Sequence, residues 1–121
     1  MMYFKAGEFE CKCGACNMGL KDMDENFIRK LDLARSIAKT PFIVNSAIRC
    51  KDHNDNIDGL SNSAHLTGNA VDIRCKESHK RYLIIDALIR VGFNRIGIYD
   101  TFIHVDNDET KPARVVWIDG G

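Results

Sequence analysis

The sequence lacks an excess of charge of either sign. Seventeen lysines and arginines are balanced by seventeen aspartates and glutamates among 121 residues, which gives a formal net charge of zero. A protein that binds nucleic acid in a general way carries a basic excess or a basic stripe, and this chain has neither. We therefore expect no nucleic-acid partner.

A long apolar run is also missing. No stretch approaches the roughly 20 apolar residues that a membrane-spanning helix needs, so we expect no membrane span. The opening residues, MMYFKAGEFE, have neither the basic start nor the apolar stretch of a signal peptide, which predicts synthesis in the cytoplasm. No repeat or low-complexity segment divides the chain. Its length, with 45% apolar and 28% charged residues, predicts one globular domain over residues 1–121.

Cysteine, in contrast, is abundant for this length, and the number of cysteines is odd. Cys11, Cys13 and Cys16 form a cluster, whereas Cys50 and Cys75 stand apart, so complete disulfide pairing within one chain is excluded. Three interpretations stay open, namely disulfides that include Cys50, buried free thiols, and a zinc site of Cys11, Cys13, Cys16 and Cys50. Because the Cys-x-Cys spacing is tighter than the usual two-residue gap, we rank zinc behind the other two.

The pattern of apolar residues mixes helices and strands without strict alternation. Residues 1–20 have no periodicity and are expected to form a Cys-rich loop. Helical spacing predicts one helix over 24–38 and a second that Ser78 caps and Gly92 terminates. The apolar face of the second helix is expected to consist of Tyr82, Ile85, Leu88 and Ile89. Strand patterns occur at 42–48, 70–73, 95–99, 102–106 and 114–118. We predict an α+β fold with a largely antiparallel sheet and two main helices packed against it.

Residues 50–69 are dense in Asn, Asp, Ser and Gly, which favour turns and bond to their own backbone. We expect a loop without regular structure here. Loops of this length are usually either functional or disordered, and the position of this one between two strands favours a functional loop.

Three polar residues stand where a strand or tight turn would leave them unpaired. Asp72 lies between apolar residues of a short strand, where an unpartnered carboxylate is costly. His65 precedes a glycine that permits a turn into that strand, and His104 shares a strand face with Asp106. A zinc ion held by His65, Asp72 and His104, with water as fourth ligand, would satisfy all three. In the alternative interpretation, Asp72 pairs with a nearby arginine and the histidines have structural roles.

These residues also resemble those of a known family. The string Ser63-x-His65-x-x-Gly68-x-Ala70-x-Asp72-Ile73 is similar to the signature of the zinc peptidases that include D-alanyl-D-alanine carboxypeptidases, D-Ala-D-Ala dipeptidases and phage L-alanyl-D-glutamate endopeptidases, a scaffold shared by hedgehog signalling domains. Residues 44–50 resemble the family's strand that ends in a substrate-facing arginine, and residues 102–106 resemble the strand of the third zinc ligand. The start, Phe9-x-Cys11-x-Cys13-Gly14, is similar to a small bacterial and phage branch.

The resemblance implies a role for each matching residue. It implies that zinc binds His65, Asp72 and His104, polarises the scissile carbonyl and lowers the pKa of its bound water. It further implies that Arg49 and Ser63 contact the substrate. A guanidinium fork suits the carboxylates of peptidoglycan stem peptides.

Our leading hypothesis is therefore a zinc metallopeptidase that cuts peptidoglycan stem peptides at the bacterial cell wall or periplasm. It would act as a D-Ala-D-Ala carboxypeptidase or an endolysin-type endopeptidase. The alternative from another class is a catalytically silent, zinc-stabilised module that binds the cell wall or belongs to a phage structure. Both hypotheses predict zinc, and turnover distinguishes them.

The chain departs from the better-known members of this family at the general base. They carry Glu or Asp three residues before the third zinc ligand, where this chain has Thr101. Asp100, one residue further back, is expected to accept the proton of water if the turn bends toward the metal. Asp106 shares the strand face of His104 and is the second candidate for a catalytic base. It is otherwise expected to orient a ligand or Arg49.

Overall fold

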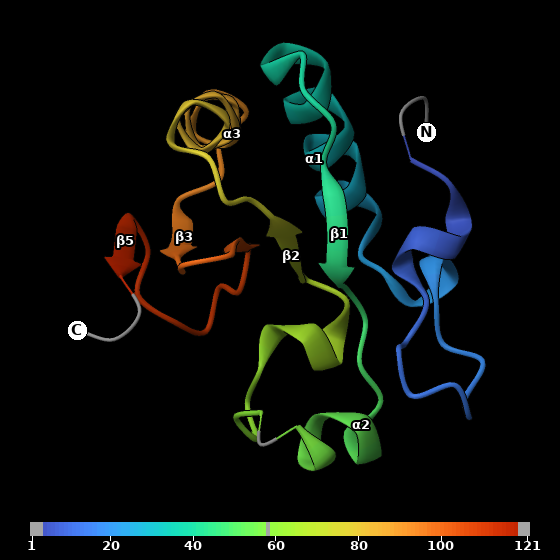
Figure 1. Cartoon of the computed structure of the whole chain (residues 1–121). Helices are drawn as coiled ribbons and strands as arrows, with labels where there is room; N and C mark the ends of the chain where they lie inside the picture. The colour runs from blue at the N-terminus through green and yellow to red at the C-terminus, as the bar shows by residue number, and fades with distance from the viewer. Residues whose placement is uncertain (1–3, 58, 119–121) are drawn as a thin grey trace.

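The computed structural model describes residues 4–57 and 59–118, so the remainder of the expected domain 1–121 lies outside the described residues. A five-stranded sheet of order β1-β2-β4-β3-β5 forms its centre (Figure 1). The strands are β1 (Ile43–Ser46), β2 (Ala70–Arg74), β3 (Arg95–Ile98), β4 (Phe102–Asp106) and β5 (Val115–Ile118). The pairs β1–β2, β2–β4 and β4–β3 are antiparallel, whereas β5 pairs with β3 in parallel. The predicted α+β fold with a largely antiparallel sheet is confirmed.

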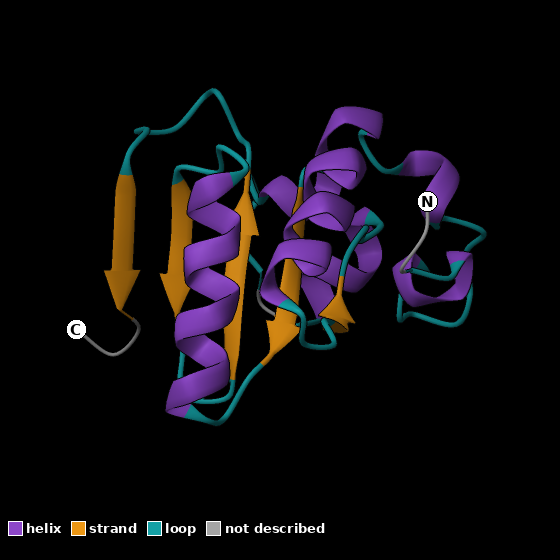
Figure 2. Cartoon of the chain, turned by 90° about the horizontal axis from the view of Figure 1, so that it is seen from above, coloured by secondary structure: helices purple, strands orange, loops and turns teal. Residues whose placement is uncertain are grey.

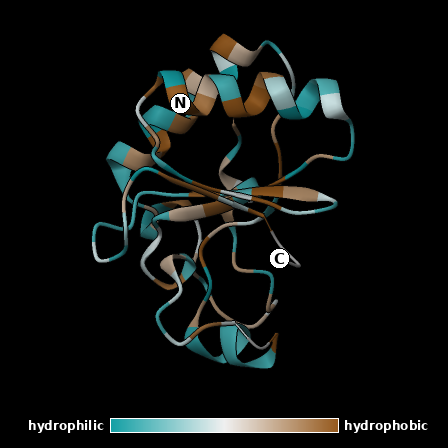
Figure 3. Ribbon diagram, turned by 90° about the vertical axis from the view of Figure 1, so that its left-hand side faces the viewer, coloured by the Kyte–Doolittle hydropathy of each residue, from teal (hydrophilic) through white to brown (hydrophobic). Residues whose placement is uncertain are grey.

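Two helices, α1 (Glu25–Ala38) and α3 (Ser78–Arg90), cover one face of this sheet (Figures 2 and 3). Helix α1 begins where the Asp24 carboxylate accepts the backbone N–H of Phe27 at 2.9 Å. It ends at Ala38, and the C-cap residue Lys39 that follows has a left-handed backbone conformation. Its buried residues follow the predicted spacing and are Phe27, Ile28, Leu31, Ala34 and Ala38. No helix of the described residues is both long enough and apolar enough to span a membrane.

Helix α3 differs from the prediction in its cap and its buried face. Glu77, not Ser78, is the N-cap residue, and no side chain caps the helix. The helix buries Ile84, Ala87 and Leu88, whereas two residues of the predicted face, Tyr82 and Ile89, are exposed. Apolar residues lie almost all around this helix, so their spacing alone leaves its orientation open.

The N-terminal segment, expected as a loop, contains two turns of 3-10 helix and contributes to the core. The turns are η1 (Ala6–Phe9) and η2 (Leu20–Asp22). Phe4 and Phe9 are buried, with ring centroids 5.4 Å apart, and Phe4 also lies 6.4 Å from Phe42. Aromatic packing of this kind needs no periodic pattern, which is why the sequence did not reveal it.

Residues 50–69, also expected as an irregular loop, contain helix α2 (Lys51–Asn56) and the 3-10 helix η3 (Ala64–Thr67). Each begins at a side-chain cap, where Cys50 accepts the N–H of His53 and Ser63 accepts the N–H of His65. This segment lies on the sheet face opposite α1 and α3 (Figure 3). The turn-forming residues thus start short helices here.

Gly68 ends η3 at a position where no other residue fits. Its φ is +74°, and a Cβ there would lie 2.2 Å from the carbonyl oxygen of Asp22. The left-handed conformation costs a residue with a Cβ roughly 1–2 kcal/mol. We expect Gly68→Ala to lower the free energy of unfolding by more than this, because the backbone of Asp22 must also move. Gly14→Ala is the matched control, since Gly14 has φ +71° and nothing within 4 Å. Equal losses in urea unfolding would contradict this account.

Candidate metal centre

Cross-strand register places five residues in one row across the sheet. Ser46 pairs with Asp72, Asp72 with His104, His104 with Gly97, and Gly97 with Trp117. Directly paired residues project from the same face of a sheet. This face is opposite the one that packs on α1 and α3. The strand pairing therefore brings a carboxylate and an imidazole, 32 residues apart in the chain, side by side.

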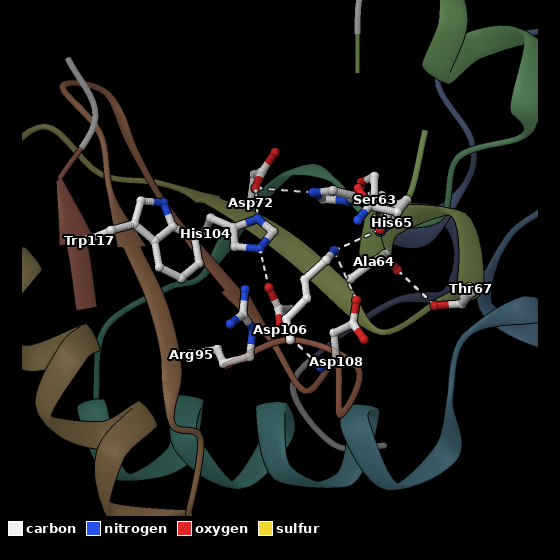
Figure 4. A network of polar contacts seen from close by, with 12 residues as sticks. Ser63, Ala64, His65, Thr67, Asp72, Arg95, His104, Asp106, Asp108 and Trp117 are labelled. Carbon is white, nitrogen blue, oxygen red and sulfur yellow. Dashed lines mark hydrogen bonds and ion pairs between the residues drawn. The ribbon is translucent and has the colours of Figure 1, made fainter. Parts of the chain in front are cut away.

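His65 enters this group from η3. Its Nε2 lies 3.3 Å from Oδ1 of Asp72, and Nδ1 of His104 lies 2.9 Å from the same oxygen (Figure 4). The ligand atoms of the three residues all lie within 4.8 Å of one another. The structure thus brings together His65, Asp72 and His104, the three residues that the sequence analysis singles out as metal ligands.

The outer nitrogen of each imidazole has an acceptor that fixes its proton. His65 Nδ1 lies 2.7 Å from the carbonyl oxygen of Ala47, and His104 Nε2 lies 2.7 Å from Oδ2 of Asp106. Since both partners accept, each outer nitrogen carries hydrogen, and the inner nitrogen of a neutral ring presents a lone pair. Two lone pairs and a carboxylate oxygen then converge on one point. Such a buried set of acceptors needs a cation, which fits a metal ion.

Without a metal, a proton takes the place of this cation. Burial lowers the pKa of His104, but hydrogen bonds to Asp106 and Asp72 outweigh it and raise the pKa above its usual value. Burial likewise raises the pKa of Asp72, and hydrogen bonds from His104 and His65 more than reverse this, so the carboxyl stays ionised. Asp72 is therefore anionic throughout the neutral range, as a metal ligand needs to be.

Arg49 reaches the other oxygen of the same carboxylate. Its Nη2 lies 3.4 Å from Oδ2 of Asp72, while Nε donates to Ser46 at 3.1 Å and Nη1 to Asn54 at 3.3 Å. Asp72 thus pairs with an arginine, as the alternative interpretation predicts, through Oδ2. Its Oδ1 still faces the two histidines and is available to a metal ion. Buried Asn54, which the sequence analysis missed, also donates to the carbonyl of Leu60 and so ties Arg49 to the loop.

Asp106 is held from two sides. Its Oδ2 accepts from His104, and its Oδ1 accepts from Nε of Arg95 at 2.7 Å and from the backbone of Asp108 at 3.0 Å. Burial raises its pKa, but the hydrogen bond from His104 and the others lower it below the usual value. Arg95, itself buried, was missed by the sequence analysis. Its position opposite Asp106 follows from strand pairing that only the fold reveals.

An open cleft of about 390 Å³ contains this group. Its aromatic wall is formed by Tyr99 and Phe102, whose rings stack at 4.3 Å, and by Trp117, whose ring centroid lies 5.6 Å from that of His104. A Cβ on Gly97 would lie 2.5 Å from the indole of Trp117, so the glycine makes room for it. A glycine inside a strand often marks the close approach of another group. Gly97 was therefore the one sequence feature that could have indicated a bulky side chain such as Trp117 at this place.

The remaining predicted residues differ in their placement. Ser63 lines the cleft, and its hydroxyl accepts the backbone N–H of His65 at 3.2 Å. Asp100 and Thr101 are exposed in the turn between β3 and β4, outside the cleft lining. Among the described residues, the carboxylates that line the cleft are Asp72 and Asp106. The structure does not bring Asp100 to the metal group.

Replacing Asp106 tests whether its hydrogen bond with His104 orients that imidazole for metal binding. An asparagine at this position would face His104 or Arg95 with an N–H₂ group, donor against donor. We expect Asp106→Asn to weaken zinc binding at this centre by about 10–100-fold, as for other partners of metal-bound histidines. Asp100→Asn is the exposed control and should leave zinc affinity unchanged. Chelator competition measures both, and equal affinities in the two variants would contradict the role of Asp106.

Two imidazoles and one carboxylate in an open cleft are the ligand set of a catalytic metal centre, since structural zinc sites are closed by four protein ligands. Comparison with known families agrees with this class. The model of the family described as "Peptidase M15" matches residues 2–106, a range that contains all three ligand candidates. The chain therefore belongs to the peptidase M15 family of metallo-enzymes, as its sequence motifs predict. A search of curated proteins found no match.

Proposed function

We propose that this chain is a zinc-dependent peptidase that hydrolyses peptide bonds of peptidoglycan stem peptides at the bacterial cell wall or periplasm. The observation that carries the proposal is the convergence of three acceptor atoms, from His65, Asp72 and His104, within 4.8 Å in a cleft of a peptidase-family fold. Nitrogen and oxygen donors in this combination suit Zn²⁺. Zinc bound there would supply Lewis acidity to the scissile carbonyl and lower the pKa of water.

The charge of the cleft supports an acidic substrate. Its lining contains the cations Arg49, Arg95 and Lys111 against the carboxylates Asp72 and Asp106, before the charge of any metal is added. A cleft of net positive charge concentrates anionic ligands. Stem peptides are anionic through their carboxylates, and their small alkyl side chains suit the aromatic wall.

Arg49 is the residue we propose for holding the substrate. Its three contacts with Ser46, Asn54 and Asp72 fix the plane of the guanidinium group at the cleft. The group has further N–H donors for a substrate carboxylate or carbonyl, and a fixed fork binds such oxygens in a defined geometry. The Ser63 hydroxyl at the same wall has a donor of its own to offer.

One observation favours a second candidate function, a zinc-stabilised module that binds the cell wall without turnover. Both carboxylates of the described cleft lining, Asp72 and Asp106, are occupied by histidines and arginines. Neither is free to accept the proton of an attacking water. The binding module predicts zinc and muropeptide binding but no hydrolysis.

Incubation with defined muropeptides separates the two functions. The zinc-loaded chain is expected to give product pairs whose masses sum to the substrate plus one water. Loss of a terminal alanine would identify a carboxypeptidase, and an internal cut an endopeptidase. The metal-free chain is the control. Unchanged muropeptides beside a zinc-loaded chain would favour the binding module.

Zinc binding at this centre is expected to weaken as pH falls through the pKa of His104, which lies above the ordinary 6.5. A proton on Nδ1 and the metal compete for one lone pair, so neutral His104 binds and the protonated form does not. Below that pKa, affinity should fall about tenfold per pH unit, and above it should level off. Chelator competition at a series of pH values measures this. An affinity that does not change with pH would contradict the competition.

A further inference from the structure

Four of the five cysteines, three from the N-terminal cluster and the distant Cys50, lie close together in space. The sulfur atoms of Cys11, Cys13, Cys16 and Cys50 all lie within 4.8 Å of one another, and those of Cys13 and Cys16 are 3.4 Å apart. Cys75 lies elsewhere, and its thiol donates to the carbonyl of Glu77. The odd cysteine count thus resolves into one cluster of four and one separate buried thiol.

The N-terminal half of this cluster is a tight loop. The N–H of Cys11 donates to the carbonyl of Met18 at 3.0 Å and closes the loop at its base. Inside it, Gly14 with φ +71° turns the chain, and the N–H of Ala15 donates to Cys13 Sγ at 3.3 Å. Cys13 and Cys16 therefore have the two-residue gap of zinc-binding turns, and the tight Cys-x-Cys spacing concerns Cys11 alone.

The fourth sulfur arrives from the segment that follows Arg49. Cys50 caps α2, where its Sγ accepts the N–H of His53 at 3.3 Å, and its own N–H donates to Cys11 Sγ at 3.3 Å. Three of the four sulfurs thus accept a backbone N–H. Sulfur in a thiol is a weak acceptor, whereas a thiolate is an anion that such donors stabilise. The pattern fits thiolates.

We propose that Cys11, Cys13, Cys16 and Cys50 bind a second zinc ion in a closed tetrahedral site. Zinc–sulfur bonds of about 2.3 Å require sulfur atoms roughly 3.8 Å apart, which the cluster meets with small movements. A site closed by four protein ligands is structural. It fastens residues 11–16 to Cys50 and thereby holds the backbone next to Arg49 at the edge of the cleft.

This site differs from the alternatives in its contacts. Disulfides would pair the sulfurs two by two, whereas here all four converge on one centre with N–H groups directed at them. The charge of four thiolates exceeds that of zinc, and the guanidinium group of Arg49, which interacts electrostatically with Cys11, places a positive charge beside the site. The chain thus has two metal centres of different chemistry, one with nitrogen and oxygen ligands and one with sulfur.

Zinc counting by elemental analysis tests the second site separately from the first. The wild-type chain, purified without added oxidant, is expected to hold two zinc ions, and the His104→Ala chain one. Adding Cys13→Ser and Cys16→Ser to His104→Ala should leave none, whereas adding Cys75→Ser, the control, should leave one. A zinc-free His104→Ala chain would overturn the site, whatever the outcome for the peptidase activity.

Two measurements on chains with intact cysteines keep the proposal testable if the serine variants do not fold. Cobalt(II) added to metal-free His104→Ala protein should give an intense thiolate-to-cobalt charge-transfer band with the absorption of a tetrahedral ion. The denatured wild-type chain should have the mass of fully reduced cysteines. A mass four hydrogens lower would show two disulfides and overturn the site, as would cobalt binding without the charge-transfer band.

Discussion

The His104→Ala variant is expected to lose the zinc of the His65–Asp72–His104 centre and, with it, peptidase activity. The substitution removes one of three ligands and leaves the Asp72 and Asp106 carboxylates without their shared partner. Metal polarisation of the carbonyl is worth several kcal/mol, so we expect the hydrolysis rate to fall on the order of 10³-fold or more. Elemental analysis and muropeptide hydrolysis measure the two losses on one sample.

His79→Ala is the matched control for this substitution. His79 is exposed on α3, on the far side of the sheet from the cleft, and its removal should change neither zinc content nor rate. A His104→Ala chain that keeps two zinc ions and hydrolyses muropeptides at the wild-type rate would show that zinc binding and hydrolysis do not depend on the His65–Asp72–His104 centre.

Arg49→Lys is expected to keep the zinc and to lower kcat/KM about 10–100-fold. A single ammonium group cannot reproduce the fork that contacts Ser46, Asn54 and Asp72 and still reach a substrate oxygen. The loss of one charge-assisted hydrogen bond, about 1.5–3 kcal/mol, sets this range. Steady-state kinetics with a defined muropeptide, alongside zinc analysis, measures the effect.

The exposed Arg74 on the same strand as Asp72 provides a control. Arg74→Lys should leave kcat/KM unchanged. If Arg49→Lys also does so with its zinc intact, Arg49 has a structural role only, and the substrate is held elsewhere in the cleft.

Much of the fold could be predicted because its signals are local. The face of α1 repeats at helical spacing, and each sheet strand has its own short apolar pattern. The ligand candidates were visible for a related reason. A carboxylate between two buried strand residues, as at Asp72, and an imidazole in a strand, as at His104, break the apolar pattern and therefore require partners.

The residues that were missed depend on contacts between distant segments. Arg95 and Asp106 meet through the pairing of β3 with β4, and Trp117 reaches the cleft only because β5 joins the sheet in parallel beside Gly97. The spacing of a single strand contains no such information. The Cys cluster differs, because the sequence analysis includes Cys50, 34 residues beyond Cys16, as a possible fourth zinc ligand. Spacing alone could not show that the four sulfur atoms converge, and it therefore ranked zinc behind disulfides and free thiols.

The rate of muropeptide hydrolysis during a zinc titration tests whether the His65–Asp72–His104 centre makes this chain a peptidase. The titration starts from wild-type chain stripped of the metal of the His65–Asp72–His104 centre, with zinc content followed in parallel. We predict that the rate rises in proportion to zinc bound at this centre and levels off at one equivalent, while the His104→Ala chain stays inactive. Hydrolysis by the stripped chain, or no hydrolysis at full occupancy, would contradict the account.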